Sequence, residues 1–209
     1  MAAIRFGVDF LKGECNVGKS SLLTSLNLII VPGFLQHYLN VQKKFLTSEQ
    51  KQRLVQWVYA VMAFSSYSSS VEASLDIDIR YIKENSIDDA LELLRKRAFG
   101  TFSLEGSISP RDLEGKNSAS GLFNLLFINA LRSGATDWSS PYPRIQLTPM
   151  TNGFKIEYHH FFPKAQIKSK ASRDLWNSLA NLAFITSKTN KLISDRVPEE
   201  YVIELPVTE

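Results

Sequence analysis

The clearest candidates for proton-transfer chemistry in this chain are two adjacent histidines, His159 and His160. An imidazole has its ordinary pKa near neutrality, so it can take a proton from water. A second imidazole and an Asn carbonyl can hold a divalent cation, which stabilises negative charge on a leaving oxygen. These residue types predict metal-assisted hydrolysis; the alternative interpretation is a half-buried strand end without a chemical role.

Two short strands and a helix are expected to position the histidines. Phe154–Tyr158 alternates apolar and polar residues after a turn at Asn152-Gly153, which is typical of a strand. The apolar Leu182–Ile185 predicts a second strand, and Lys188–Asp195 predicts a helix. Neighbouring strand residues point to opposite faces, so the histidines share one site only if the strand ends or bends between or just after them. Pro163 is well placed to end it.

The match to a known motif extends well beyond the histidine pair. It comprises His159-His160-Phe-Phe-Pro163, Asn181-Leu182, Thr186, Asn190-Lys191, Ile193-Ser194-Asp195 and Pro198-Glu-Glu-Tyr201. This run resembles the HNH or His-Me finger nuclease motif. More narrowly, it is similar to the C-terminal nuclease domain of the GmrSD-type restriction enzymes, which cut foreign or modified DNA.

The resemblance implies roles for four residues. His160 would be the general base that activates water, His159 and Asn190 would hold the metal ion, and Asn181 would hold the loop and the base in position. Where the family often has Asp, this chain has His159, a softer and less charged ligand than carboxylate. The implied cofactor is Mg²⁺ or Mn²⁺, with Co²⁺ or Ni²⁺ as alternatives.

Positive charge is concentrated around this motif. Residues 155–196 hold eight Lys or Arg against three acidic residues, whereas the net charge of all 209 residues is only +3. A basic surface attracts the phosphates of nucleic acid, although a solvated face is the alternative. DNA is the predicted partner, and Lys164, Lys188 and Lys191 are the predicted phosphate contacts.

A second motif lies near the N-terminus. Gly13–Ser20 matches the phosphate-binding pattern G-x-x-x-x-G-K-[ST]. Such a loop follows a buried parallel strand, whereas Ile4–Leu11 is short, is interrupted and carries two charged residues. A P-loop nucleotide-binding protein is therefore the less favoured alternative.

Composition indicates an ordinary folded protein, with 44% hydrophobic and 22% charged residues. The single cysteine, Cys15, excludes an internal disulfide and a Cys-based zinc site, which fits the cytoplasm of a bacterium or archaeon. The longest apolar run, Leu26–Leu35, is interrupted and too short for a bilayer, which needs ~20 residues. No membrane partner is predicted.

Helical patterns dominate the rest of the chain. Thr47–Gln50 has the form of a capping box, and apolar residues recur at helical spacing after it. Further helices are predicted at Val71–Lys83, Ile87–Phe99 and Ser118–Arg132. The predicted fold class is mainly α with a small α+β element: a helical module at 1–145 followed by a ββα-metal finger nuclease at 146–209, packed as one unit.

The predicted function is that of a metal-dependent DNA endonuclease in a restriction or phage-defence system. The main alternative is a catalytically silent finger that serves as a DNA-binding or interaction module. In the GmrSD-type enzymes an N-terminal NTP-hydrolysing domain governs the nuclease, so such a domain or subunit is a further expected partner. An oligomer in which two sites act together would favour a double-strand cut.

Overall fold

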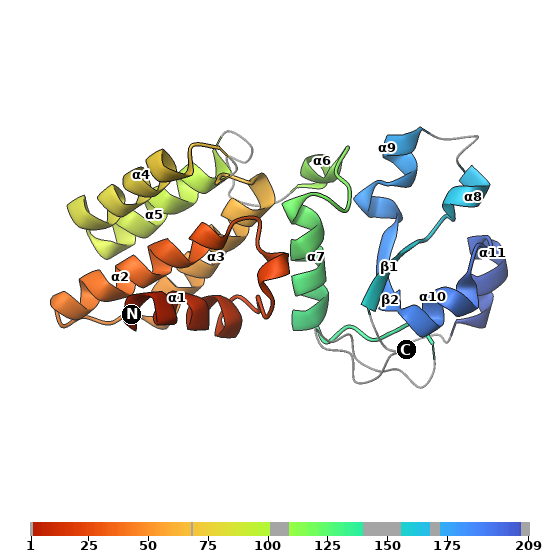
Figure 1. Cartoon of the computed structure of the whole chain (residues 1–209), viewed down its shortest axis with the longest axis horizontal. Coiled ribbons are helices and arrows are strands. Elements are labelled where there is room, and N and C mark those ends of the chain that lie inside the picture. The colour runs from red at the N-terminus through yellow and green to blue at the C-terminus, as the bar shows by residue number, and fades with distance from the viewer. Residues whose placement is uncertain (1, 68, 101–108, 140–155, 168–171, 206–209) are drawn as a thin grey trace. The chain divides into compact units, whose positions relative to one another are not determined.

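The computed structural model describes residues 2–67, 69–100, 109–139, 156–167 and 172–205 (Figure 1). The chain divides into two compact units, residues 1–109 and 110–209. Helices dominate the described residues, and a two-stranded antiparallel sheet lies near a helix of the C-terminal region. The predicted fold class, mainly α with a small α+β element, is confirmed.

Helices make up the described part of the first unit. Its elements are α1 (Ala2–Gly13), η1 (Ser20–Leu22), η2 (Leu26–Ile29), α2 (Ile30–Val41), α3 (Ser48–Phe64), α4 (Val71–Glu84) and α5 (Ile87–Phe99). The predicted capping box starts α3: the Gln50 amide donates to Thr47 Oγ1 and the Thr47 amide donates to Gln50 Oε1, each at 3.1 Å. Helix α5 ends at Gly100, whose φ of 55° suits glycine.

Two glycines allow α1 and α2 to pack closely. A Cβ at Gly7 would lie 2.2 Å from the Ile29 carbonyl oxygen, and one at Gly33 would lie 2.6 Å from that of Ala3. The core of the unit is apolar, with its largest fully buried side chains including Leu28, Leu35, Leu39, Leu54, Trp57, Met62, Ile82, Leu91 and Leu94. These contacts hold the helices together by burying apolar surface.

Short elements make up most of the second unit. They are α6 (Pro110–Leu113), α7 (Gly121–Arg132), β1 (Ile156–His160), α8 (Lys164–Ile167), α9 (Arg173–Trp176), η4 (Leu179–Asn181), β2 (Leu182–Thr186), α10 (Ser187–Ile193), α11 (Pro198–Tyr201) and η5 (Val202–Glu204). The predicted order of strand, strand and helix is confirmed as β1, β2 and α10. The turn predicted at Asn152-Gly153 and the domain boundary predicted at 145/146 lie outside the described residues.

The two faces of the sheet have different neighbours. Tyr158 pairs with Phe184 across the strands, and the ring of Phe123 in α7 lies 5.4 Å and 5.0 Å from these two rings. Alternation places His160 on this same face and His159 on the other. The opposite face carries Ile185, which packs in a core cluster with α10 and α11.

The described part of the C-terminal tail, residues 198–205, forms two short helical elements and is anchored by Tyr201. Pro198 occupies the first turn of α11, where its missing amide proton and fixed φ favour helix initiation. Tyr201 is buried, and its hydroxyl donates to the Phe161 carbonyl at 2.8 Å. In the described part of the chain, no helix combines the length and apolar character needed to cross a membrane.

Candidate active site

His159 and Asn190 face each other across the contact between β1 and α10. His159 Nδ1 lies 2.9 Å from Asn190 Oδ1. Thr186 caps α10, because its side chain accepts from the Thr189 amide, and this cap fixes where the helix starts. Asn190 thereby sits one turn into α10 and reaches the strand, and the two predicted metal ligands lie together.

Burial favours the neutral form of the His159 imidazole. The residue is 4% exposed, and the rings of Trp138 and Tyr201 pack edge-on against its ring, with centroid distances of 6.0 Å and 5.9 Å. Burial lowers the pKa of the His159 imidazole, the contact with Asn190 opposes that change, and nearby His160 lowers it further. A neutral imidazole is the form that binds a metal ion.

The other ring nitrogen of His159 is unusual. Nε2 is buried and has no hydrogen-bond partner among the described residues. The oxygen of Asn190 can only accept, so Nδ1 carries the proton in the metal-free protein, and a cation at Nδ1 would require that proton to move to Nε2.

The atom types of the pair suit a divalent cation. The 2.9 Å between Nδ1 and Oδ1 is a hydrogen-bond distance, and an imidazole nitrogen and an amide oxygen are both groups that would bind such an ion. The described residues include no cluster of three or more His, Cys, Asp or Glu side chains suited to a metal. A cation held by His159 and Asn190 would complete its shell with water and phosphate oxygens.

His160 has a separate environment. The strand runs through both histidines, with His159 opposite Ala183 and His160 opposite Leu182, so their side chains leave opposite faces. His160 is half-buried, and its Nε2 lies 3.3 Å from Asn177 Oδ1. With the Asn177 oxygen as acceptor, Nε2 carries the proton and the Nδ1 lone pair is available to take another.

Asn181 holds the loop that follows the histidines. Its Oδ1 accepts from the Phe162 amide at 2.7 Å, and its Nδ2 donates to the carbonyls of Phe162 at 3.1 Å and Trp176 at 2.9 Å. The side chain is 7% exposed. This arrangement suits the positioning role that the resemblance implies, and it joins the segment just after β1 to the segment just before β2.

The structure adds a buried carboxylate that the sequence analysis did not single out. Asp137 is 2% exposed and accepts hydrogen bonds from the Thr186 amide at 2.9 Å, the Thr186 hydroxyl at 2.7 Å and the Ser139 hydroxyl at 3.1 Å, and also from the Thr189 hydroxyl. Burial would raise the pKa of Asp137, but these hydrogen bonds together lower it. Asp137 therefore fixes the junction between β2 and α10.

Two more side chains join the site without having been predicted. Glu157 Oε2 accepts from Asn190 Nδ2 at 2.8 Å, and Asn177 contacts His160 as described. Glu157 precedes His159 by two residues, so strand alternation could have identified it. No sequence signal marks Asn177 or Asp137, because their partners are 17 and 49 residues away along the chain.

The three predicted phosphate-contacting lysines are all exposed. Lys188 and Lys191 lie on α10, the helix that carries Asn190. Lys164 begins α8, and its Nζ lies 4.1 Å from the centroid of the Trp176 ring. Two of the three therefore share an element with the candidate metal position.

The phosphate-binding pattern near the N-terminus lacks the expected setting. Gly13 is the last residue of α1, so the pattern follows a helix and not a buried strand.

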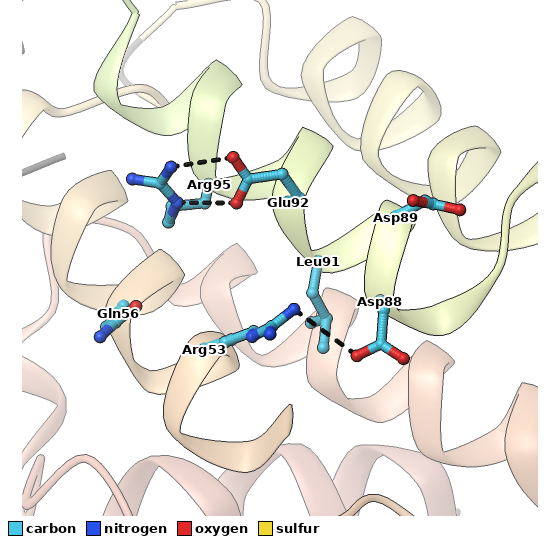
Figure 2. A pocket seen from close by; sticks show the side chains of 7 residues that line it. All are labelled: Arg53, Gln56, Asp88, Asp89, Leu91, Glu92 and Arg95. Carbon is cyan, nitrogen blue, oxygen red and sulfur yellow. Dashed lines mark hydrogen bonds and ion pairs between the residues drawn. The ribbon is translucent and has the colours of Figure 1, made fainter. Parts of the chain in front are cut away.

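Elsewhere in the first unit, a pocket of about 420 Å³ lies between α3 and α5. Figure 2 shows that four of its charged side chains form two pairs, Arg53 with Asp88 and Arg95 with Glu92. The described pocket thus offers no unpaired cluster of one charge.

Comparisons with known proteins identify no family for the chain. No family model matches the chain, and no solved structure matches it. The chain is similar to Uncharacterized protein MJ0686 from Methanocaldococcus jannaschii, with 28% identity over 156 residues. The match covers 71% of this chain and 24% of that protein, so the chain spans about a quarter of the length of its curated relative.

Proposed function

We propose that this chain is a metal-dependent endonuclease that hydrolyses DNA phosphodiester bonds, with its active site in the second unit. The observation that carries the proposal is the 2.9 Å contact between His159 Nδ1 and Asn190 Oδ1. These two residues come from a strand and a helix 31 positions apart, and the nuclease motif assigns both to the metal ion. The exposed lysines on α10 support DNA as the substrate.

The environments of the histidines support a division of labour. His159 is buried and burial lowers its pKa, so it suits a ligand and not a group that exchanges protons with water. His160 is half-buried and can reach solvent, so it suits the general base. His160 takes a proton from water, the oxygen of that water forms a bond to phosphorus, and the bond from phosphorus to the 3′ oxygen breaks. A bound cation would stabilise the negative charge on the leaving oxygen.

A second candidate function is a catalytically silent DNA-binding module. The observation that favours this function is that the side chains of His159 and His160 lie on opposite faces of β1. His160 is the last residue of β1. For catalysis, a phosphate must lie across this end of the strand, because only there can it approach the side chains of both histidines. A silent module would bind DNA without that requirement.

The deciding experiment is cleavage of supercoiled plasmid by the purified chain with Mg²⁺, Mn²⁺, Co²⁺ or Ni²⁺. We expect metal-dependent nicking or linearisation, and a loss of about 10²- to 10⁴-fold in rate for His160→Ala. His37→Ala is the matched control, because His37 is exposed on α2 in the first unit. DNA binding by both proteins without cleavage under any metal would favour the silent module.

The choice of metal is a separate part of the proposal. His159 replaces a family carboxylate, and imidazole suits Mn²⁺, Co²⁺ and Ni²⁺ better than Mg²⁺, which prefers oxygen ligands. We expect one of these three ions to support faster cleavage than Mg²⁺. A panel in which Mg²⁺ ranked clearly first would contradict this expectation.

The proposed setting is the cytoplasm of a bacterium or archaeon, where the enzyme would act on foreign or modified DNA. Regulation by an NTP-hydrolysing domain or subunit is part of the same proposal and follows from the resemblance alone. Two copies acting together would account for double-strand cuts. Adding the regulatory partner to an inactive chain and restoring cleavage would test the first of these points.

A further inference from the structure

We propose that Glu157 is a positioning residue that orients the side-chain amide of Asn190, so that its carbonyl oxygen faces the metal position beside His159. This inference rests on the proposed function. It starts from the 2.8 Å hydrogen bond that Asn190 Nδ2 donates to Glu157 Oε2. The same amide presents Oδ1 to His159 Nδ1 at 2.9 Å.

An asparagine needs such an orienting partner because its amide has two ends of similar shape and opposite chemistry. Only the carbonyl oxygen binds a cation, whereas the NH₂ group donates hydrogen bonds. An ionised carboxylate can only accept, so the NH₂ end must face Glu157. The oxygen is thereby turned toward His159, and the alternative orientation would lose this charge-assisted bond.

The strand supplies this geometry directly. Glu157 and His159 are two residues apart in β1 and so share a face of the sheet. Asn190 from α10 contacts both side chains: its Oδ1 faces His159 and its Nδ2 donates to Glu157. The arrangement fixes Asn190 before any cation binds, which lowers the ordering cost of binding.

The test measures the affinity of the metal-free full chain for Mn²⁺, in the absence of DNA, by isothermal titration calorimetry. Loss of a group that orients a metal ligand costs about 10- to 100-fold in affinity, which is the expected loss for Glu157→Ala. Glu157→Gln should stay within about threefold of the unchanged protein, because its carbonyl can accept the same hydrogen bond. Glu199→Ala is the matched control: Glu199 is an exposed acid of α11 in the same unit.

Two results would overturn the inference. Binding by Glu157→Ala that equals the control would show that Asn190 needs no orienting partner. Binding by Glu157→Gln that is as weak as that of Glu157→Ala would show that the carboxylate itself holds the ion. A chain that binds no Mn²⁺ at millimolar concentration would also refute a positioning role toward a metal.

A second measurement follows the hydrogen bond without any metal. The side-chain NH₂ signals of Asn190, identified by their absence in Asn190→Ala, should shift and exchange faster in Glu157→Ala but not in Glu157→Gln. Unchanged signals in Glu157→Ala would contradict the inference. Failure of the nuclease proposal is distinguishable, because plasmid would then stay uncut although Mn²⁺ binding and these signals respond as expected.

Discussion

Two buried polar side chains, Asp78 in the first unit and His159 in the second, differ in how completely they are hydrogen-bonded. In the first unit, fully buried Asp78 accepts from the Tyr67 hydroxyl at 2.5 Å and from Arg97 Nη1 at 2.8 Å, so each carboxylate oxygen has a partner. In the second unit, buried His159 has one polar neighbour, the neutral amide of Asn190, and its Nε2 has none among the described residues.

This difference separates a closed network from one that can take a ligand. Burial raises the pKa of Asp78, and the contacts with Tyr67 and Arg97 offset only part of that rise, so loss of a partner would leave a buried charge uncompensated. The contact of His159 with Asn190 joins two neutral groups, and a cation could replace it with two stronger bonds. The comparison predicts loss of stability from one network and loss of function from the other.

The largest expected effect concerns the two faces of the sheet. His159→Ala should lose both Mn²⁺ binding and cleavage, whereas His160→Ala should keep Mn²⁺ binding and lose about 10²- to 10⁴-fold in cleavage rate. Calorimetry and plasmid cleavage on the same preparations measure the two properties. Normal Mn²⁺ binding by His159→Ala would break the assignment of the buried face to the metal.

The next effect concerns the closed network. Asp78→Ala leaves Arg97 and Tyr67 without their buried partner, and breaking a buried ion pair costs about 3–5 kcal/mol. Urea unfolding should show this loss, while Mn²⁺ affinity at low temperature stays unchanged. Asp76→Ala is the control, because Asp76 is exposed on the same helix. A loss below about 1 kcal/mol would mean that the pair contributes little.

Asp137 supplies a smaller effect that depends on pH. Asp137→Asn removes the charge that accepts hydrogen bonds from Thr186 and Thr189, and loss of a buried charged acceptor costs about 1–3 kcal/mol. The pKa of Asp137 is lowered in the folded protein. Its contribution is therefore present above the unfolded pKa of about 3.9 and is lost as pH falls through the folded value.

Unfolding experiments across pH check this sign. The stability gap between the unchanged protein and Asp137→Asn should be full near neutral pH and should narrow below about pH 4. A gap that widened toward acid pH would contradict the lowered pKa. Stability measured without metal keeps this test separate from catalysis.

Local signals explain why much of the fold could be predicted from the sequence. The Thr47–Gln50 box and the stop at Gly100 need only a few neighbouring residues. Helix α3 begins where the box predicts, and α5 spans the predicted Ile87–Phe99. The sheet was also predictable from alternation, although its first strand extends through His160, two residues beyond the predicted Tyr158. The extension matters because it fixes the histidines on opposite faces.

The partners of the site residues could not be predicted in the same way. Residue types and the motif identified His159 and Asn190, but the hydrogen bond of His160 to Asn177 depends on where the end of α9 lies against the sheet. Asp137 lies in a different segment from Thr186, and only tertiary packing brings them together. Side chains joined over long loops carry no periodic signal, so a sequence pattern cannot pair them.

The smallest expected effect concerns the exposed lysines. The slope of the logarithm of the DNA binding constant against the logarithm of salt concentration reports the number of neutralised phosphates. Removal of a Lys that neutralises a phosphate makes this slope less steep by about 1. Lys188→Ala and Lys191→Ala should each show this change in DNA titrations from low to moderate salt, and Lys44→Ala, an exposed lysine of the first unit, should not. Lys164→Ala should change the slope less, because its ammonium lies over the Trp176 ring and is already engaged there. The contrary result would be equal slopes for Lys188→Ala, Lys191→Ala and the control. The DNA would then lie away from α10, and its phosphates would not reach the His159–Asn190 pair.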